Sequence, residues 1–306
     1  MILVAGGTGR LGGALLNLLA EEGREVRILA RDRQRAGKLA GGIQFAAGDV
    51  REPHTLAPAL AGVEAVVSAV TGFGPRGDGP GQVDHLGNAN LIAAAEVAGV
   101  KRFVLVSVRD ARPDHPLELN RMKFRAEERL RSSTLDWTIL RPTAFMELWA
   151  TIIGGGDSPA GRPTVFGPGD NRVNFVSVRD VARYVQLALN DPGLRGSTLE
   201  VGGPENLSPN EMLAIVREAR DRTVAARHVP LPVLRLGALL MRPIRPRLAD
   251  LLQAGVLMAT TDMTFDPSAL HARFPDVLPI RLAEALHARA QGPKDLPANG
   301  RQALSA

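Results

Sequence analysis

Three glycines form the segment of this chain with the clearest chemical meaning. Gly6, Gly9 and Gly12 follow the apolar run Ile2–Ala5 and overlap a helix-like run at 10–23. Glycine permits a tight turn out of a strand, lets backbone approach a pyrophosphate and lets a helix pack closely on a sheet. The helix N-terminus would then present unpaired N–H groups to phosphate oxygens. This arrangement predicts a dinucleotide site, although its G-x-x-G-x-x-G spacing differs from the commoner G-x-G-x-x-G.

The residue after the second apolar strand, Val26–Ala30, discriminates between nicotinamide cofactors. An NAD site usually places an acid here to hold the ribose 2′-hydroxyl. This chain has Arg31, whose planar fork suits a 2′-phosphate, and Arg10 could close on the same phosphate. Asp32 would be the NAD-type acid if the register shifted by one residue, and arginines that simply begin an exposed helix are the alternative. The sequence therefore favours NADP(H) over NAD(H).

The ends of the other strands supply the remaining expected cofactor contacts. In a doubly wound sheet, ligands bind beyond the carboxyl ends of the strands. Asp49 follows the third strand, and we expect it near the adenine. The full predicted cofactor-binding set is Gly6, Thr8, Gly9, Arg10, Leu11, Gly12, Arg31, Asp49, Val50, Ala69, Val70 and Lys123.

Lys123 is the predicted acid–base group with the most unusual position. At ~100° per residue it lies with Leu119, Met122 and Ala126 on one apolar stripe of a helix. A lysine in a buried stripe is costly unless its ammonium reaches a partner or a cleft. We therefore expect Lys123 to contact cofactor or substrate, or else to form an ion pair, with Glu127 as the expected partner.

Two further side chains are candidate catalytic groups. Ser107 ends the fifth strand and could hydrogen-bond substrate or merely close the strand. His115 could act as an acid because histidine titrates near neutrality, although a single loop histidine is more often incidental. The six histidines lack metal-ligand spacing and no G-x-S-x-G elbow occurs, so we predict neither a metal site nor a hydrolase.

The pattern of the first half of the chain predicts alternating strands and helices, which would position these residues. Continuous apolar strands suit a parallel sheet that is covered on both faces. We therefore predict an α/β fold, a doubly wound parallel sheet of the Rossmann type with a smaller C-terminal substrate lobe. The predicted domains are residues 1–150 and 151–290, the second a smaller lobe interleaved with the Rossmann core, with a disordered tail at 291–306. The predicted strands are Ile2–Ala5, Val26–Ala30, Ile43–Ala47, Ala65–Val70, Phe103–Ser107 and Trp137–Leu140, and the predicted helices lie at about 10–23, 33–40, 53–61, 82–98 and 116–132.

The second half has more mixed patterning. Ser208 is a plausible N-cap for a helix over Glu211–Arg220. The run Pro230–Ala259 is interrupted by arginines and prolines too often for a transmembrane helix. It favours substrate-pocket or subunit-interface helices over a membrane-surface helix. Other predicted features are strands at Val173–Val178 and Thr198–Val201, a helix at 179–189, and loops at Gly72–Gly81 and Gly154–Pro163 that are either lids or ordinary surface loops.

The composition is that of a globular protein with an unremarkable charge. With 306 residues, 45% of them hydrophobic, the chain can bury a sizeable core. The absence of cysteine excludes disulfides and thiolate chemistry and fits a reducing cytoplasm, and the first strand leaves no room for a signal peptide. The net charge of +5 comes with only 4% aromatic residues, which argues against nucleic-acid binding.

The order of motifs resembles the NmrA-like family of atypical short-chain dehydrogenases/reductases. The matching segments are VAGGTGRLGG, ILARDR, GDV, VDHLGNANLIAAAEVAGVKRFVLVS, LDWTILRPTAFMELW, VNFVSVRDVA and LEVGGPENLSPNEMLAIV, which lie within residues 1–220. The resemblance implies a Rossmann domain that binds NADP(H) and a smaller substrate lobe. It does not imply activity, because the family also contains cofactor-sensing proteins.

The resemblance also locates a missing group. Most short-chain dehydrogenases use a Tyr-x-x-x-Lys pair, and here Lys123 occupies the lysine position while Leu119 stands where the tyrosine would be. Tyr184 is the one tyrosine and has no lysine four residues on. In isoflavone-reductase-like relatives a lysine at this place is thought to act as base or acid, and the resemblance extends that role to Lys123.

Three functional hypotheses follow. The first is an NADPH-dependent reductase of a small apolar acceptor such as a quinone, enone, carbonyl or imine, in which Phe145, Met146 and Trp149 help to line the pocket or simply belong to the core. The second is a non-catalytic protein that senses NADP(H) in regulation or assembly. An epimerase or dehydratase is a weaker third, since those enzymes generally need the tyrosine. We expect a small-molecule substrate, no nucleic acid, no integral membrane segment and a homodimer as one compatible assembly.

Overall fold

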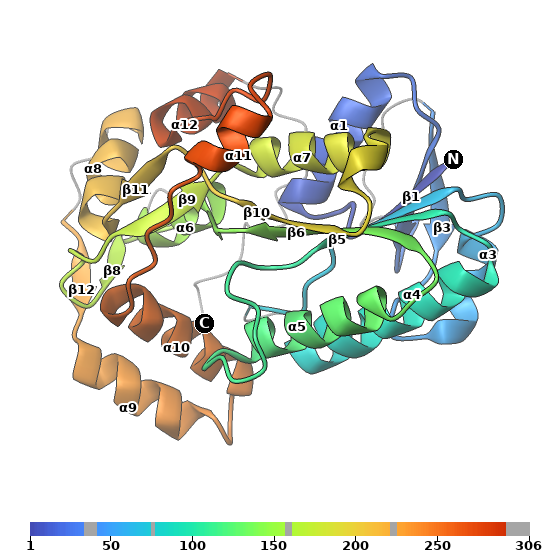
Figure 1. The fold of residues 1–306 in the computed structure, drawn as a ribbon. Coiled ribbons are helices and arrows are strands. Elements are labelled where there is room, and N and C mark those ends of the chain that lie inside the picture. The colour runs from blue at the N-terminus through green and yellow to red at the C-terminus, as the bar shows by residue number, and fades with distance from the viewer. Residues whose placement is uncertain (34–41, 75–76, 157–160, 221–224, 292–306) are drawn as a thin grey trace. The chain divides into compact units, whose positions relative to one another are not determined.

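Seven parallel strands form the central sheet of this protein (Figure 1). The computed structural model describes residues 1–33, 42–74, 77–156, 161–220 and 225–291. The strand order is β10-β6-β5-β4-β1-β2-β3. From the β1–β4 pair the chain proceeds outward in both directions, which is the arrangement of a doubly wound fold. The strands are β1 Ile2–Ala5, β2 Val26–Ala30, β3 Ile43–Ala47, β4 Ala65–Ser68, β5 Arg102–Val106, β6 Asp136–Pro142 and β10 Ser197–Val201.

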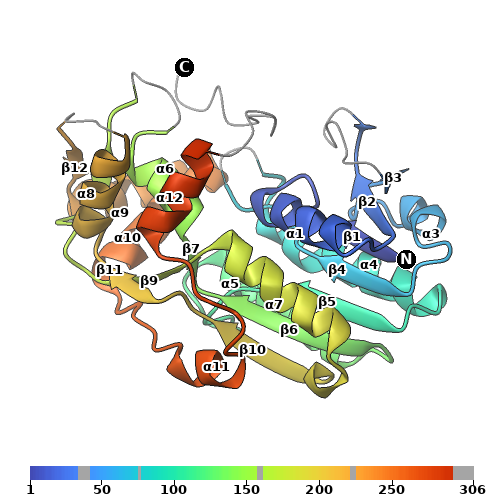
Figure 2. The ribbon, with the colours of Figure 1, turned by 90° about the horizontal axis from the view of Figure 1, so that it is seen from above.

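Helices cover both faces of this sheet. Figures 1 and 2 show α1 (Arg10–Glu21) beside α7 (Val178–Asn190) on one face. The other face is covered by α4 (Asn88–Val97) and α5 (Glu118–Arg131). Burial on both faces explains why the strands are continuous apolar runs with no polar alternation. The predicted fold class, a doubly wound parallel sheet, is confirmed.

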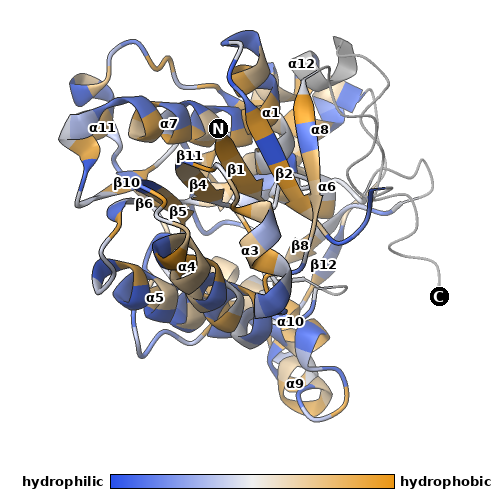
Figure 3. Ribbon diagram, turned by 90° about the vertical axis from the view of Figure 1, so that its right-hand side faces the viewer, coloured by the Kyte–Doolittle hydropathy of each residue, from blue (hydrophilic) through white to orange (hydrophobic). Residues whose placement is uncertain are grey.

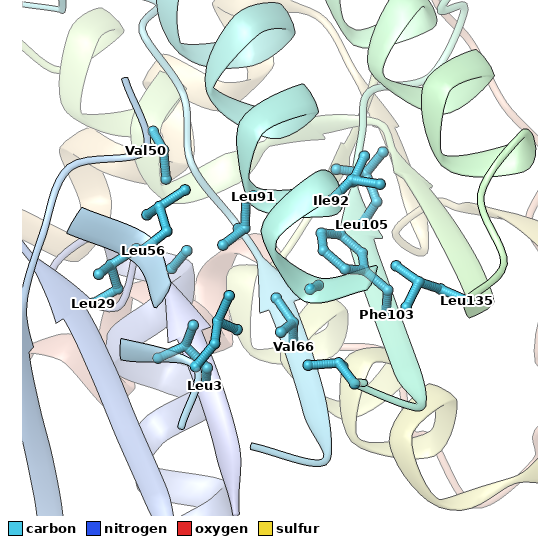
Figure 4. Packing of buried hydrophobic residues seen from close by; sticks show 14 of the residues in the cluster. Leu3, Leu29, Val50, Leu56, Val66, Leu91, Ile92, Phe103, Leu105 and Leu135 are labelled. Carbon is cyan, nitrogen blue, oxygen red and sulfur yellow. The ribbon is translucent and has the colours of Figure 1, made fainter. Parts of the chain in front are cut away.

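The hydrophobic core between the sheet and the α4–α5 face contains large side chains with no solvent exposure. Leu3, Leu91, Phe103 and Leu105 each have an exposed fraction of 0%. Figure 4 shows these side chains converging from the strands and from α4. Figure 3 shows the complementary pattern, with orange strands inside and blue residues on the outer side of α5. This core fixes the positions of the strand ends at which the predicted site lies.

The predicted elements of the first half are found with small changes at their ends. The predicted strand Ala65–Val70 ends early, at Ser68. The helix predicted at 82–98 is a π-helix, Gly81–Gly87, followed by α4. The helix predicted at 53–61 is a short 3₁₀ turn, Pro53–Thr55, followed by α3 (Leu56–Ala59). The helix predicted at 33–40 lies almost entirely outside the described residues.

The chain divides into two compact units. The first is Met1–Pro142 with Val178–Val201, and the second is Thr143–Ser177 with Gly202–Ala306. The first boundary follows Pro142, and α7 and β10 return to the first unit. β10 pairs with β6, so the strand predicted at 198–201 is the seventh member of the central sheet. The predicted disordered tail, apart from Gln291, lies outside the described residues.

The second unit consists of small sheets and helices. Ser208 Oγ accepts a hydrogen bond from Glu211 N at 3.2 Å, which confirms the predicted N-cap at the start of α8. Within the described residues, no helix is long and apolar enough to cross a membrane. The strands are β7 Ala144–Phe145, β8 Thr164–Phe166, β9 Val173–Val176, β11 Glu205–Leu207 and β12 Arg227–Val229, and the helices are α6 Met146–Ile153, α8 Pro209–Arg220, α9 Leu231–Met241, α10 Pro246–Thr260, α11 Ser268–Arg273 and α12 Leu282–Gln291.

Candidate functional site

The glycine turn after β1 is packed so tightly that two of its positions exclude a side chain. Gly6 has a φ of +88°, and a Cβ there would lie 2.5 Å from the carbonyl oxygen of Ala69. A Cβ on Gly12 would lie 2.3 Å from the carbonyl oxygen of Gly6. α1 begins at Arg10, and no side chain at its N-cap position, Gly9, accepts a hydrogen bond from its first N–H groups. A tight turn that leads into an uncapped helix N-terminus fits a pyrophosphate.

The other predicted cofactor-binding residues near the glycine turn differ in how exposed they are. Thr8 and Arg10 are exposed beside the turn. Leu11 is buried, so it can contribute only its backbone N–H. Ala69 and Val70 are half-buried just beyond the end of β4.

Two arginines lie beyond the ends of β2 and β3 and share one carboxylate. Arg31 Nη1 lies 2.8 Å from Asp78 Oδ2, and Arg51 Nη1 lies 3.1 Å from Asp78 Oδ1. We call Arg31 and Arg51 the arginine pair. Each oxygen of Asp78 thus contacts a different guanidinium, as the oxygens of a phosphate can. Arg31 and Arg51 therefore form a two-cation group beyond β2 and β3, and the binding of a 2′-phosphate by Arg31 stays a prediction.

Asp49, which we expected near the adenine, hydrogen-bonds with Arg51 in this structure. Its Oδ1 accepts hydrogen bonds from the backbone N–H and from Nε of Arg51, both at 3.0 Å. The side-chain hydrogen bonds from Arg51 hold the pKa of Asp49 below its usual range. Asp49 therefore orients Arg51. Val50, next to it, is buried.

Lys123 is fully engaged by protein groups. Its Nζ donates to the carbonyl oxygens of Val70 and Val106, both at 2.9 Å, and lies 3.1 Å from Asp84 Oδ1. Lys123 is only 4% exposed and Asp84 is 0% exposed. The expected ion pair with Glu127 is therefore wrong, since the partner is Asp84 from the π-helix. Two carbonyl oxygens accept hydrogen bonds from the ammonium and a carboxylate lies at ion-pair distance, so Lys123 ties the segment after β4 to the last residue of β5.

Asp84 continues this network toward the glycine-rich segment after β4. Its Oδ2 accepts a hydrogen bond from Gly72 N at 2.8 Å. Burial raises the pKa of Asp84, and the nearby Lys123 ammonium opposes that rise. Asn88 Nδ2 donates to the Asp84 carbonyl oxygen at 2.8 Å, and Ser68 Oγ donates to Asn88 Oδ1 at 2.6 Å. A connected set of buried polar groups thus fixes the carboxyl end of β4.

Ser107 points into a second buried network. Its Oγ donates to Glu127 Oε1 at 2.5 Å, and Glu127 is 0% exposed. Arg141 Nε donates to the same Glu127 oxygen at 2.9 Å, and Arg131 Nη2 donates to Oε2 at 2.9 Å. The hydroxyl proton of Ser107 is therefore committed to Glu127, which leaves Ser107 only its acceptor capacity.

His115 is held in one orientation by two neighbours. Its Nδ1 accepts a hydrogen bond from Leu117 N at 3.1 Å, and its Nε2 lies 3.4 Å from Asp110 Oδ2. Burial lowers the pKa of His115, although Asp110 opposes the shift. The ring is therefore predominantly neutral at pH 7, with its proton on Nε2, which makes it a weak proton source at that pH.

Comparison with known proteins identifies the family. Residues 6–192 match the family model described as NAD(P)H-binding. The chain belongs to this NAD(P)H-binding family. The expected membership among the NmrA-like atypical short-chain dehydrogenases/reductases is thereby confirmed.

Individual relatives of this family have different activities. The NAD(P)H azoreductase of Xenophilus azovorans is 36% identical over 226 residues, which cover 73% of this chain and 75% of the relative. Photosystem II assembly factor Ycf39 of Synechocystis sp. is 30% identical over 237 residues, which cover 76% and 72%. The matched family model shows an NAD(P)H-binding chain, and the relatives' names include both a reductase and an assembly factor.

A solved structure shows the same fold. The NADPH-dependent quinone oxidoreductase of Escherichia coli, solved in complex with NADPH, superimposes with a TM-score of 0.73 at 22% identity. The match covers 95% of this chain and 100% of that one. At this identity the likeness concerns the fold alone.

Within this NAD(P)H-binding family member, no phenol lies beside Lys123. Leu119, at the tyrosine position, is half-buried one turn before Lys123 on α5. Tyr184 belongs to α7, on the opposite face of the sheet. Burial raises the pKa of Tyr184 to about 12. Tyr184 therefore does not replace the missing proton donor.

The apolar residues after β6 lie in the second unit and are largely core. Met146 and Trp149 are 1% and 9% exposed, and the Trp149 ring meets Phe166 edge-on with centroids 6.3 Å apart. Phe145 is half-buried. Met146 and Trp149 therefore belong to the hydrophobic core of the second unit.

Sequence reasoning missed four residues that the structure brings to the site. Arg51 was overlooked although it follows Asp49 by two positions, a signal that was available. Asp84 and Asn88 give a weaker signal, as two polar residues four apart in an otherwise largely apolar helix. Asp78 gives no signal, because only the fold brings it to the arginine pair. Among the described residues, no cluster of metal-ligating side chains occurs.

Proposed function

We propose that this chain is an NADPH-dependent reductase of a small, largely apolar acceptor. The observation that carries the proposal is the arginine pair beyond β2 and β3, on the same sheet edge as the glycine turn. Two guanidinium groups suit a 2′-phosphate, whereas an acid at the end of β2 would suit a ribose hydroxyl. The azoreductase relative supports an acceptor with a conjugated, electron-poor bond, such as a quinone, enone, imine or azo compound.

The chain's own residues bind and orient the cofactor. Bound NADPH supplies the hydride. Gly6, Gly9 and the first turn of α1 hold the pyrophosphate, and the arginine pair holds the 2′-phosphate. The tie from Lys123 to Val70 keeps the segment after β4 against the glycine turn, which fixes the wall of the site. Orientation of this kind supplies most of what hydride transfer requires.

The proton follows a route that needs no tyrosine. Lys123 donates to two carbonyl oxygens beside the buried Asp84, and Ser107 donates its hydroxyl proton to Glu127, so we assign both to positioning. A quinone or azo acceptor gains electron density as it accepts hydride, and water can then supply the balancing proton. This assignment replaces the sequence-based hypothesis that Lys123, Ser107 or His115 transfers the proton.

Turnover of NADPH with a panel of acceptors tests the proposal. Purified protein is mixed with NADPH and with quinones, enones, imines or azo dyes, and cofactor absorbance is followed. Oxidation above the rate of the protein-free mixture is expected with at least one class. If NADPH binds tightly and every class fails, the reductase proposal is wrong.

The alternative is a protein that senses NADP(H) in an assembly process. The full engagement of Lys123 and the lack of a nearby phenol favour it, as does the likeness to Ycf39. The same panel discriminates the two, because a sensor binds NADPH without oxidising it. A cytoplasmic location and a homodimer remain predictions from the sequence.

A further inference from the structure

Asp78 occupies the arginine pair in a way that resembles a phosphate. One carboxylate oxygen contacts Arg31 at 2.8 Å and the other contacts Arg51 at 3.1 Å. Guanidinium groups bind carboxylate and phosphate oxygens by the same parallel hydrogen bonds. An anion entering this place must therefore compete with Asp78.

The backbone that carries Asp78 is fixed close to the sheet. Gly79 N donates to the Gly72 carbonyl oxygen at 3.1 Å, and Gly72 N is held by the buried Asp84. The Asp78 side chain itself is 31% exposed and that of Arg31 is 41% exposed. Asp78 is thus presented to the arginines from a tethered backbone, and its carboxylate can exchange with a dissolved anion without unfolding of the sheet edge.

The two arginines respond differently to the loss of Asp78. Arg51 keeps Asp49 as a partner, with Nη2 at 2.5 Å from Oδ2. Asp78 is the carboxylate in direct ion-pair contact with Arg31, whereas Asp49 interacts with Arg31 only through its charge. Arg31 is therefore the cation whose charge Asp78 most directly neutralises.

We propose that Asp78 is a specificity-determining residue that competes with the 2′-phosphate for the arginine pair. By occupying both guanidinium groups, it weakens NADPH binding and leaves NADH binding, which places no phosphate there, almost unchanged. Asp78 therefore reduces the difference between the affinity for NADPH and the affinity for NADH. This inference rests on the cofactor assignment and does not require that the protein be an active reductase.

Equilibrium binding tests this inference without turnover. Dissociation constants for NADPH and NADH are measured by calorimetry for the wild type, Asp78→Asn and Asp78→Ser. Both variants are expected to bind NADPH about tenfold more tightly, with NADH changed by less than about twofold. Glu64→Gln is the matched control, because it removes the same charge from the opposite end of β4, where Glu64 is 78% exposed.

The possible outcomes separate the hypotheses. Equal tightening of NADPH and NADH, or an equal effect of Glu64→Gln, would overturn the role of Asp78. If the wild type binds neither cofactor, the cofactor site itself is wrongly assigned. Tighter binding of adenosine 2′-monophosphate by Asp78→Asn, with 5′-monophosphate unchanged, would assign the effect to the 2′-phosphate.

An independent observation concerns α9 in the second unit, which is apolar on nearly all sides. Leu234 and Ala238 are buried, and α9 packs on α10. On the other side, large apolar side chains face solvent, and Figure 3 shows α9 as mostly pale and orange. We call this set the α9 face: Val233, Leu236, Leu239, Leu240 and Ile244, with exposed fractions of 56, 56, 70, 54 and 72%. A helix that is apolar all round normally has both sides covered.

The charges beside the α9 face are predominantly positive, and Arg242 Nη2 lies 3.6 Å from Asp250 Oδ1 on α10. Between His228 and Ala249 the charged residues are Arg235, Arg242, Arg245 and Arg247, and all four are exposed. Arg235 and Arg242 line a hollow of about 170 Å³ beside α9. Ile244, the most exposed member of the face, lies in a turn between arginines. Apolar side chains bordered by cations match the boundary of an anionic bilayer.

We infer that the α9 face docks on an anionic lipid surface. A second copy is a poorer occupant, because two-fold pairing of this face would bring two arginine-bordered faces together. The apolar residues enter the acyl boundary while the arginines contact headgroup phosphates. The protein thereby lies on the membrane and does not span it.

Vesicle sedimentation tests the docking. The full chain is mixed with phosphatidylcholine vesicles, with or without about 30% phosphatidylglycerol. It should sediment with the anionic vesicles only, and Leu236→Glu with Leu240→Glu should reduce binding at least tenfold. Val97→Glu is the matched control, because Val97 is a single exposed apolar residue on α4, 90% exposed. Equal binding to neutral vesicles, no binding, or a dimer that the double variant dissociates would overturn the inference.

Discussion

Buried charged side chains in the first unit bind backbone carbonyls and one another. Lys123 contacts two carbonyl oxygens and Asp84. The carboxylate of Glu127 contacts Ser107, Arg131 and Arg141. A buried ion pair contributes little net stability compared with apolar residues, but removing one partner alone leaves an uncompensated charge. These residues are therefore sensitive to substitution whether or not they touch a substrate.

Substitution of Lys123 should chiefly affect stability. Lys123→Met leaves Asp84 buried without its ammonium, which should cost about 3–5 kcal/mol of unfolding free energy. Adding Asp84→Asn should restore at least half of this, because the amide removes the charge and keeps an acceptor for Gly72 N. Urea denaturation measures both variants. Unchanged stability of Lys123→Met together with lost turnover would instead indicate a direct catalytic role.

Substitution of Arg31 should separate the two cofactors. Arg31→Ala removes hydrogen bonds to a charged group, worth about 1.5–3 kcal/mol, so NADPH should bind roughly 10- to 100-fold more weakly. NADH should change by less than about threefold. Arg24→Ala is the control, since Arg24 lies at the amino end of β2 and hydrogen-bonds Asn190. Equal weakening of both cofactors would mean that Arg31 does not contact the 2′-phosphate.

At the scale of elements, the glycine turn is defined by close packing. Gly12 has no room for a methyl group, whereas a Cβ added to its neighbour Gly13 would meet nothing within 4 Å. The two positions lie in the same helix, α1, and differ only in what they face. The packing of α1 against the turn therefore depends on Gly12 and not on glycine content as such.

A pair of alanine variants tests this difference. Gly12→Ala should push α1 away from the turn, lower the melting temperature and weaken NADPH binding at least about tenfold. Gly13→Ala should keep the affinity and gain up to about 1 kcal/mol of stability from helix propensity. Calorimetry and thermal unfolding give both values. If both variants behave alike, the tight packing at Gly12 has no bearing on the cofactor.

The sequence predicted elements better than pairings between them. β1, β2 and β3 were located correctly because each is a short apolar run bounded by polar or glycine residues. The membership of Ser197–Val201 in the central sheet was missed, since it depends on a pairing with β6 that is distant in sequence. The same holds for the site. Arg31 could be predicted because it directly follows an apolar strand, whereas the contact of Asp78 with the arginine pair depends on the fold.

At the scale of the whole molecule, the two units differ in how well sequence patterns describe them. The first unit is a doubly wound sheet whose topology dictates where a dinucleotide binds. The second unit holds short strands and helices without a comparable rule, and the acceptor class cannot be read from its pattern. The proposed reductase activity therefore depends on the cofactor-binding unit, which would hold NADPH for hydride transfer.

Transfer of deuterium from labelled NADPH tests the proposed hydride transfer. NADPH deuterated at nicotinamide C4 is prepared in its two stereochemical forms, and each is incubated with the protein and an acceptor that supports turnover. The account predicts that one form, and not the other, delivers its deuterium to the reduced product, as mass spectrometry would show. Products without deuterium from either form would contradict hydride transfer by this protein.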